Sequence, residues 1–273
     1  MHTYHVTMQQ DLVSVIMPTY NTGKVLSDSI DSILEQSYPY LEVLITDDGS
    51  TDPYTLDLLK QYEAKDSRIK VSYLDSNSGA AIARNKSIER AQGRYIAFCD
   101  SDDRWAPDKV EKQVAFMREK QCALCSSSYF IVDSDCNIIG IFRSPQTITY
   151  GMYKRDNKIG CLTAMYDTQL LGRKYYMPAT RKRQDWGLFL DILKNSKKCY
   201  AIAEPLAYYR KHNNSLSSNK RSLIKYNINI YKQVLGFSPV KSFLYFSFLF
   251  LPTYFLKTLK VRWDSYRYLA EKK

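Results

Sequence analysis

Three aspartates crowd into four positions directly after an apolar run. In the stretch RYIAFCDSDDRW, Asp100, Asp102 and Asp103 follow residues typical of a buried strand. Like charges this close repel one another and resist removal from water, so the cluster is either a well-solvated turn or a site for a cation. Carboxylates are the protein ligands that Mg²⁺ and Mn²⁺ take when they bind a nucleotide diphosphate. An isolated Asp-x-Asp fits a solvated turn as well, so the rest of the sequence has to decide.

Two earlier apolar runs also end in polar residues that suit nucleotide binding. Asp48 lies in the sequence Asp-Asp-Gly-Ser, where its carboxylate could accept from a base N–H and Gly49 permits a tight turn. Tyr20 follows the first run and could stack on the same base. Ordinary turn chemistry also explains these residues, because Asp, Gly and Ser are common turn formers.

The elements that would position these residues alternate along the first hundred residues. Four short apolar or β-branched runs predict buried strands at 13–17, 42–46, 70–74 and 95–99. Amphipathic stretches between them predict helices at 25–36, 54–64 and 80–91. Such alternation predicts an α/β fold with a mostly parallel sheet flanked by helices, in which ligands bind beyond the carboxyl ends of the strands. The polar strand ends would therefore converge on one crevice.

The second half of the chain is less regular. We predict a helix from Pro107 to Lys120, strands at 124–132 and 138–142, a helix at 185–194, and strands at 200–203 and 206–210. Residues 144–183 give no clear pattern.

Five short motifs occur in a characteristic order. They are Pro18-Thr19-Tyr20-Asn21, Asp47-Asp48-Gly49-Ser50, Gly79-Ala80-Ala81 through Arg84-Asn85, Gly93-Arg94-Tyr95-Ile96 and Asp100-Ser101-Asp102-Asp103-Arg104-Trp105. In this combination the chain closely resembles glycosyltransferase family 2, the inverting nucleotide-sugar enzymes of the GT-A fold, over about residues 12–215. Within it, the chain is similar to bacterial O-antigen, capsule and exopolysaccharide glycosyltransferases. The resemblance implies the fold of the nucleotide-diphospho-sugar transferases and a UDP-sugar donor.

The resemblance also implies roles for the donor-binding residues. Tyr20 and Asp48 would contact uracil, Asp100 the ribose, Asp102 a divalent cation (Mn²⁺ or Mg²⁺), and Arg84 the ribose or diphosphate. In full, the resemblance implies that the nucleotide-sugar is contacted by Pro18, Thr19, Tyr20, Asn21, Asp48, Arg84, Asp100, Ser101, Arg210 and His212.

A catalytic base is implied at Asp185. Gln184-Asp185 stands where the family has Glu-Asp, so only the second acid keeps the role. The alternatives are that Asp185 merely caps its helix, or that Asp167 or Asp191 is the base. Tyr-Arg-Lys-His at 209–212 resembles the family's basic lid motif, whose Arg210 and His212 would reach the diphosphate, although His212 also reads as an ordinary loop histidine.

Absent motifs and the cysteines exclude other classes. The sequence has neither a phosphate-binding Gly-x-x-x-x-Gly-Lys-Ser/Thr loop nor a Gly-x-Gly-x-x-Gly after its first strand, which argues against an NTPase or a dinucleotide oxidoreductase. Cys122 and Cys125 have the spacing of half a zinc site, but no second such pair exists. We therefore expect all six cysteines to be reduced core residues of a cytosolic protein, a location that the polar N-terminus also favours.

The C-terminal tail carries most of the positive charge. Residues 220–273 contain 11 Lys and Arg against two acids, or +9 of the net +11. Within them FLYFSFLFLPTYFL, residues 243–256, is uncharged but short for a membrane span. We predict an interfacial helix or hairpin, kinked at Pro252, that binds anionic lipid and adds little to the chemistry. Packing on the catalytic domain or in a homodimer is the alternative, and nucleic-acid binding is not expected because no recognised module is present.

These observations predict a catalytic domain at 1–219, with a nucleotide-binding half at 12–105 and an acceptor half at 106–219, followed by a helical membrane-associating tail at 220–273. We expect a metal-dependent hexosyltransferase, peripheral on the inner face of a bacterial cell membrane, that transfers glucose or galactose from a UDP-sugar to a lipid-diphosphate-linked glycan. The alternatives are a sugar nucleotidyltransferase of similar fold, whose glycine-rich activation loop is missing, and a non-catalytic membrane-surface binding module.

Overall fold

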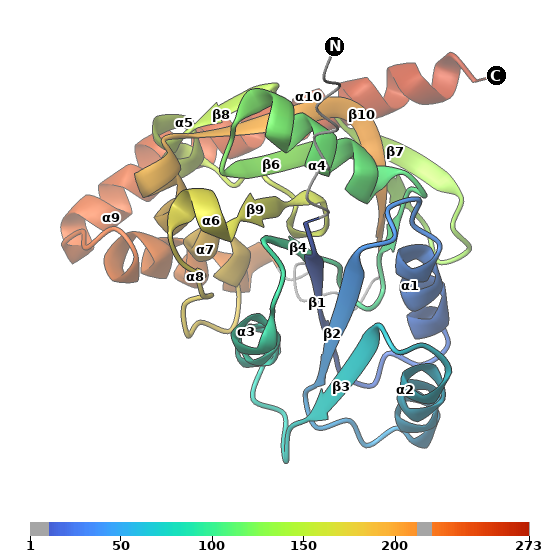
Figure 1. Cartoon of the computed structure of the whole chain (residues 1–273). Coiled ribbons are helices and arrows are strands. Elements are labelled where there is room, and N and C mark those ends of the chain that lie inside the picture. Colours follow the sequence, from blue (N-terminus) through green and yellow to red (C-terminus); the bar gives the residue numbers. More distant parts are fainter. Residues whose placement is uncertain (1–10, 212–219, 273) are drawn as a thin grey trace, which may run out of the picture.

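The computed structural model of the chain describes residues 11–211 and 220–272. Helices cover both faces of one continuous ten-stranded sheet, and the C-terminal helices lie across one end of the molecule (Figure 1). The sheet order is β3-β2-β1-β4-β9-β6-β10-β5, with β7 on β6 and β8 on β10.

The predicted alternation forms the first half of the sheet. Its elements are β1 (Val13–Thr19), α1 (Val25–Leu34), β2 (Leu41–Asp47), α2 (Pro53–Lys65), β3 (Ile69–Tyr73), α3 (Ala80–Arg90) and β4 (Tyr95–Phe98). β1 pairs in parallel with β2 and β4, and β2 pairs in parallel with β3. The carboxyl ends of these strands therefore meet at one edge, as expected.

The second half combines helices and strands that the sequence predicted with short elements that it did not reveal. They run β5 (Arg104–Trp105), α4 (Lys109–Lys120), β6 (Leu124–Val132), β7 (Ile138–Phe142), β8 (Thr147–Thr149), α5 (Tyr150–Arg155), η1 (Cys161–Thr163), β9 (Met165–Asp167), α6 (Thr168–Leu171), α7 (Gln184–Ser196) and β10 (Lys198–Arg210). β9 is antiparallel to both β4 and β6, and it joins the two halves. The sheet is thus parallel from β3 to β4 and mixed beyond it. The two strands predicted within 200–210 are one strand with register shifts around Pro205.

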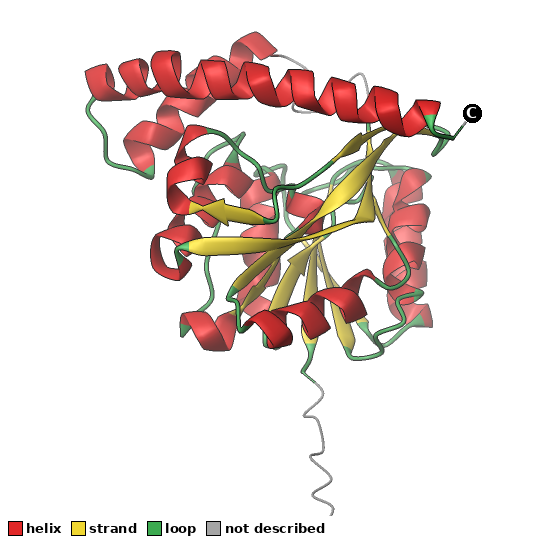
Figure 2. Cartoon of the chain, turned by 90° about the horizontal axis from the view of Figure 1, so that it is seen from above, coloured by secondary structure: helices red, strands yellow, loops and turns green. Residues whose placement is uncertain are grey.

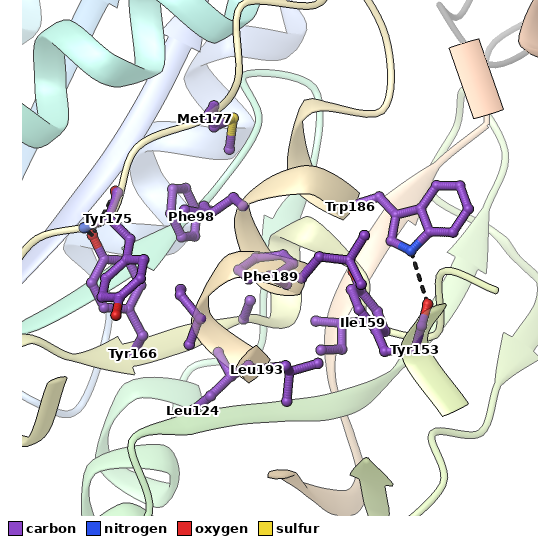
Figure 3. Packing of buried hydrophobic residues seen from close by; sticks show 14 of the residues in the cluster. Phe98, Leu124, Tyr153, Ile159, Tyr166, Tyr175, Met177, Trp186, Phe189 and Leu193 are labelled. Carbon is purple, nitrogen blue, oxygen red and sulfur yellow. Dashed lines mark hydrogen bonds between the residues drawn. The ribbon is translucent and has the colours of Figure 1, made fainter. Parts of the chain in front are cut away.

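The core has one apolar cluster on each face of the sheet. Alternate residues of β1 divide between them: Val13, Val15 and Met17 face α1, whereas Ile16 faces the α7 side. Figure 3 shows the second cluster, where Phe189 of α7 packs edge-on against Phe98 of β4 with ring centroids 5.9 Å apart. Burial of these side chains fixes α7 against the sheet.

The six cysteines are free thiols, as expected. Cys99, Cys122, Cys125 and Cys199 are buried, and Cys136 and Cys161 are partly buried. Burial raises the pKa of the Cys122 thiol to about 11, so this side chain is a neutral core group.

Apart from the connection at residues 234–238, the described part of the tail is almost entirely helical. It comprises α8 (Lys220–Gln233), α9 (Pro239–Tyr245), a π-helical turn (Phe246–Phe250) and α10 (Leu251–Ala270). α9, the π turn and α10 form one long rod that lies across the domain (Figure 2). Pro252, expected to kink a hairpin, instead follows the π turn at the start of α10, where its missing N–H is tolerated.

One face of the tail belongs to the core. Ile230, Tyr231, Phe246 and Phe250 are buried in the same cluster as Trp186 of α7. The Trp186 indole lies 5.5 Å, centroid to centroid, from both Tyr231 and Phe250. The tail helices are therefore packed on the domain along this face.

Candidate active site

A cavity of about 610 Å³ opens at the carboxyl ends of β1, β2 and β4 and extends to α7 and α10. The predicted site residues that line it are Pro18, Thr19, Tyr20, Asp48, Arg84, Asp100, Ser101, Asp102 and Asp185. Residues as distant in the sequence as Pro18 and Asp185 thus meet in one place. His212 lies outside the described residues, and Asn21 and Arg210 do not line the cavity.

At the nucleotide end, Tyr20 and Asp48 differ in how firmly they are held. Tyr20 is 46% exposed at the rim, where one ring face is available for stacking. Asp48 is 3% exposed, and its two carboxylate oxygens accept the N–H groups of Ser78 and Gly79, both at 2.8 Å. These bonds tie the end of β2 to the start of α3 and fix the carboxylate. Each oxygen keeps a lone pair for a further donor.

Glycine is required beside Asp48. Gly49 has a φ of +74°, and a Cβ atom there would lie 2.7 Å from the backbone of Ser76. Both the left-handed backbone and the close approach exclude a larger residue. The sequence Asp-Gly at this turn therefore serves the packing of the two loops as well as the site.

Asn21 holds two loops together. Its backbone is left-handed, with a φ of 46°, and its side-chain oxygen accepts the N–H groups of Thr51 and Asp52 at 2.8 and 2.9 Å. Its own N–H donates to the Ser50 hydroxyl. Asn21 therefore braces the β1 loop against the β2 loop, and its contact with the donor stays a prediction.

Arg84 and Asp100 form a buried ion pair at the floor of the cavity. The guanidinium of Arg84, which is 7% exposed, donates to Oδ1 of Asp100. Burial lowers the pKa of the Arg84 guanidinium, but the negative charge and the hydrogen bond of the neighbouring Asp100 oppose this effect, and the pKa is raised overall. The pair holds the end of β4 against α3 and fixes both side chains in the wall of the cavity.

Asp103 is a structural residue. It is 2% exposed, and one of its oxygens accepts the backbone N–H of Arg210 at 3.0 Å. Burial, together with the charges of Asp102 and Asp100, raises its pKa well above the ordinary value. The crowding of three aspartates is thus relieved in part because Asp103 turns inward and Asp100 pairs with Arg84.

Arg210 does not line the cavity, and its contact with the diphosphate stays a prediction. Its guanidinium donates to the carbonyls of Asp102 (3.1 Å) and Ser134 (3.0 Å) and to Oδ2 of Asp28 (2.8 Å). The side chain is 3% exposed. These contacts engage the donors of Arg210 and hold the loop at residues 100–103, which we call the acidic loop.

The acidic loop suits a cation that arrives with a nucleotide. Asp102 lines the cavity, whereas Asp100 and Asp103 are engaged by Arg84 and by the N–H of Arg210. Among residues 11–211 and 220–272, no group of three or more His, Cys, Asp or Glu side chains could hold a metal ion. Mg²⁺ and Mn²⁺ at phosphate sites need only one or two protein carboxylates, since phosphate oxygens and water complete the shell.

Asp185 faces this loop from the other side of the cavity. It is the second residue of α7, whose N-cap is the left-handed Arg183, so capping is not its role. Its Oδ2 accepts a hydrogen bond of 2.9 Å from the side-chain amide of Asn157. The next residue, Trp186, is fully buried and donates from its indole to the carbonyl of Tyr153 (Figure 3). This anchor sets the register of α7 and turns Asp185 toward the cavity.

The two competing aspartates lie elsewhere. Asp167 is 1% exposed, caps α6 and binds Arg94 at 2.7 Å. Asp191 is on the surface of α7 near Arg173 and does not line the cavity. Of the three aspartates Asp185 lines the cavity, and this position favours it as the candidate base.

One wall of the cavity was not predicted from the sequence. Residues 157–162 and four residues of α10 (Lys257, Thr258, Val261 and Arg262) line the cavity. Lys257 donates to the Asn157 carbonyl and to the buried Asp156, both at 2.7 Å. That the tail adds little to the chemistry stays a prediction, although four residues of α10 line the cavity. The uncharged segment 243–256 gave no hint of this, because the contributing residues lie after it.

A family model confirms the resemblance. The model described as "Glycosyl transferase family 2" matches residues 14–172.

Two curated relatives match most of the chain. The glycosyltransferase TuaG of Bacillus subtilis (strain 168), whose name assigns it provisionally to teichuronic acid biosynthesis, is 46% identical over 230 residues, which is 84% of this chain and 90% of TuaG. An Escherichia coli protein named UDP-Glc:alpha-D-GlcNAc-diphosphoundecaprenol beta-1,3-glucosyltransferase WfgD is 39% identical over 222 residues, 80% of this chain and 84% of WfgD.

A solved structure shares the fold. The crystal structure of S. aureus TarS 1-349 in complex with UDP-GlcNAc superposes with a TM-score of 0.66 at 21% identity, covering 87% of this chain and 73% of that chain. The predicted GT-A fold is confirmed.

Proposed function

The chain belongs to glycosyl transferase family 2, and from this premise we propose that it is an inverting hexosyltransferase of bacterial surface polysaccharide synthesis. Its donor is a UDP-sugar, and its acceptor is a saccharide on a lipid diphosphate. The observation that carries this proposal is that Asp185 and the strand-end pair Asp100 and Asp102 line one cavity.

The donor occupies the β1–β4 end of the cavity. Tyr20 stacks on the uracil, and Asp48, already fixed by two backbone N–H groups, accepts from the base. Asp100, held by Arg84, accepts from a ribose hydroxyl. Asp102 ligates a divalent cation that, when bound, neutralises charge on the departing diphosphate.

Asp185 acts as the general base. Its carboxylate takes the proton of the acceptor hydroxyl while that oxygen forms a bond to the anomeric carbon. The bond from this carbon to the phosphate oxygen breaks on the opposite side, and its electron pair leaves with UDP. An α-linked donor therefore gives a β-linked product. Asn157 keeps the carboxylate in place during the attack.

Glucose and galactose are the proposed sugars, and the name of WfgD favours glucose. That relative is named for UDP-glucose, for a β-1,3 linkage and for an acceptor on diphosphoundecaprenol. TuaG is named for a different polymer, and its name gives no donor. The acceptor saccharide of this chain is left open by the two relatives.

The enzyme works at the cytoplasmic face of the membrane, attached through its tail. The rod from Pro239 to Ala270 is 32 residues long, and by length and composition it is apolar enough to cross a membrane. Only 17% of its most apolar 18-residue stretch is buried inside the protein. Large apolar side chains on its outward face are strongly exposed, among them Phe248 at 72% and Trp263 at 62%. Because the opposite face packs on the domain, we propose that the rod lies in the interface rather than across the bilayer.

The test is transfer by the purified full chain. It is incubated with UDP-glucose or UDP-galactose, Mn²⁺ and a GlcNAc-diphosphoprenol acceptor, and UDP release and the product mass are measured. We expect acceptor-dependent UDP release and a product heavier by one hexose. Release of inorganic diphosphate from UTP and a sugar phosphate would indicate a nucleotidyltransferase instead. Lack of turnover with a panel of UDP-sugars and lipid-linked acceptors would favour a binding module.

A further inference from the structure

A second hollow lies beside the active-site cavity, between β7 and α10. It has a volume of about 250 Å³ and shares Phe142, Lys158, Lys257 and Val261 with the active-site cavity. Because the two share these walls, a ligand in the hollow adjoins the acceptor end of the site. We call this hollow the β7–α10 trough.

The trough is rich in positive charge. Arg143, Lys158, Lys257 and Lys260 line it, and Arg262, the residue after the shared Val261, lines the adjoining active-site cavity. Two carboxylates oppose them: Asp156, which binds Lys257 at 2.7 Å and Lys158 at 3.5 Å, and Asp264, which binds Lys260 at 2.8 Å.

Arg143 and Arg262 have no hydrogen-bond or ion-pair partner among the residues that the structure describes. The local excess of cations therefore complements a ligand with two or more negative charges.

The remaining walls are apolar. Phe142, Pro145, Leu256 and Val261 line the trough, and Leu256 is 64% exposed. The trough continues onto the outward face of α10, where Phe255 is 62% and Leu259 is 45% exposed. A hydrocarbon chain that leaves the trough along this face would stay covered if the same face rests in lipid.

The trough is also close to the catalytic base. Lys257 donates to the carbonyl of Asn157, and the side chain of Asn157 donates to Asp185. Two hydrogen-bonded contacts thus connect the trough wall with the carboxylate. A short saccharide attached to a ligand in the trough would project into the active-site cavity.

We propose that the β7–α10 trough binds the lipid diphosphate of the acceptor. The diphosphate lies among Arg143, Lys158 and Arg262, and the first isoprenoid units lie on Leu256 and Val261. The identity of the lipid rests on the proposed function, whereas the trough itself rests on the charges and apolar walls described. The tail then has two roles, since one helix contacts the membrane and selects the acceptor that the membrane carries.

Binding of farnesyl diphosphate tests the proposal without turnover. The full chain is first saturated with UDP and Mn²⁺, so that the donor site is occupied, and farnesyl diphosphate is then titrated. We expect saturable binding that Arg262→Ala weakens about tenfold, the scale for losing one charge-assisted hydrogen bond. Arg267→Ala is the matched control, because Arg267 lies on the same helix, pairs with Glu271 and does not line the trough. Its affinity should equal that of the wild type, as should the unfolding temperature of both variants.

Three results would overturn the proposal. They are equal affinity for inorganic diphosphate and farnesyl diphosphate, loss of farnesyl diphosphate binding in the presence of UDP, and unchanged affinity in Arg262→Ala. Equal affinity would make the trough an anion site without lipid selectivity. Competition by UDP would place the probe in the donor site.

A comparison of two acceptors separates this proposal from the proposed function. Arg143→Ala changes a residue that lines the trough but not the active-site cavity. It should lower kcat/KM about tenfold for a prenyl-diphosphate-linked acceptor and less than about twofold for an octyl glycoside with the same terminal sugar. Equal losses with both acceptors would count against the trough. Absence of transfer to either acceptor by the wild type, with farnesyl diphosphate binding intact, would reject the function and leave the trough standing.

Discussion

The side-chain amide of Asn157 donates a 2.9 Å hydrogen bond to Oδ2 of Asp185, and it fixes how the carboxylate faces the cavity. Asn157 is itself held, because its Oδ1 accepts the Tyr153 hydroxyl at 2.9 Å and the Ile159 N–H at 3.2 Å. Oδ1 of Asp185 makes no hydrogen bond within the described residues. One oxygen of the base is thus positioned, and the other is available to an acceptor hydroxyl.

Asp185→Asn should lower transfer by a factor of about 10² or more, which is the usual scale for losing a general base. UDP-sugar binding should stay near that of the wild type, since the substitution keeps the size of the side chain. Turnover and donor affinity are measured separately, by product formation and calorimetry. Asp191→Asn is the control on the same helix and should be mild. Weakened donor binding with normal turnover would make Asp185 a binding residue.

Asn157→Ala should lower kcat about tenfold and leave the KM for the donor unchanged, because it frees the carboxylate without touching the nucleotide end. Tyr153→Phe removes only the hydroxyl that holds Asn157, so its loss should be smaller. Steady-state kinetics of both variants check this order. A rise in donor KM without a fall in kcat would contradict the positioning role.

Asp102→Ala should remove the dependence of UDP binding on a divalent cation. The wild type should bind UDP at least about tenfold more tightly with Mn²⁺ than with a chelator, because Asp102 would hold a cation that would neutralise charge on the diphosphate. Calorimetry of UDP binding under both conditions measures the difference. Asp57→Ala, on the exposed side of α2, should behave as the wild type. An unchanged cation effect in Asp102→Ala would reject Asp102 as a ligand.

Lys109 gives the fold a pH-dependent stability. It is fully buried, its ammonium lies 3.7 Å from the centroid of the Trp105 ring, and its Nζ has no hydrogen-bond partner in the described part of the chain. Burial lowers its pKa to about 7, whereas the pKa in the unfolded chain is about 10.4. From about pH 7 to about pH 10 the unfolded chain therefore binds more protons, and the contribution of Lys109 to the free energy of unfolding rises with pH.

Lys109→Met should consequently raise the unfolding temperature by a few degrees more at about pH 6.5 than at about pH 9. Thermal unfolding of both proteins at the two pH values measures this difference. Cys99 and Cys125 remain in both proteins, and burial raises their pKa, so alkaline effects of the thiols are shared. An equal change at the two pH values would show that Lys109 does not titrate in this range.

The exposed face of the rod should act in membrane binding, and its packed face in the stability of the fold. Replacing Phe248, Phe255 and Trp263 together by Ser should release the chain from anionic vesicles without lowering its unfolding temperature, because these side chains are exposed. Flotation with vesicles and thermal unfolding measure the two effects. Tyr54→Ser, which removes an exposed aromatic from α2, is the control. Deletion of residues 237–273 is a poorer test, since it also removes the buried Phe246 and Phe250.

The nucleotide half could be predicted because its signals are local. The runs that became β1, β2 and β4 are continuously apolar, and each ends in turn-forming or acidic residues that the sequence displays directly. Asp102 and Asp185 were found through motifs, and the structure brings them to one cavity. Ser101 illustrates a further role: its hydroxyl bonds Thr22 at 2.8 Å and joins the β4 and β1 loops.

The structure of residues 144–183 could not be predicted, because it depends on long-range contacts. β9 has only three residues, too few for a periodic pattern, and it is defined by pairing with Tyr95 and Leu124. Arg210 lies in a motif typical of a ligand-binding arginine, but its guanidinium binds the carboxylate of Asp28, which is 182 residues away. The role of Asn157 likewise has no signal in the sequence, since it depends on where α7 and α10 pack.

The insertion of β9 between β4 and β6 limits how new specificities can be engineered. A chimera joined at residue 105 would combine the donor half of one relative with the acceptor half of another. It would also place one protein's β4 against the other's β9, where Tyr95 pairs with Asp167 and the carboxylate of Asp167 binds Arg94. A working chimera therefore requires that Arg94 and β4 be taken from the parent that supplies β9, so that this strand pair and ion pair are kept.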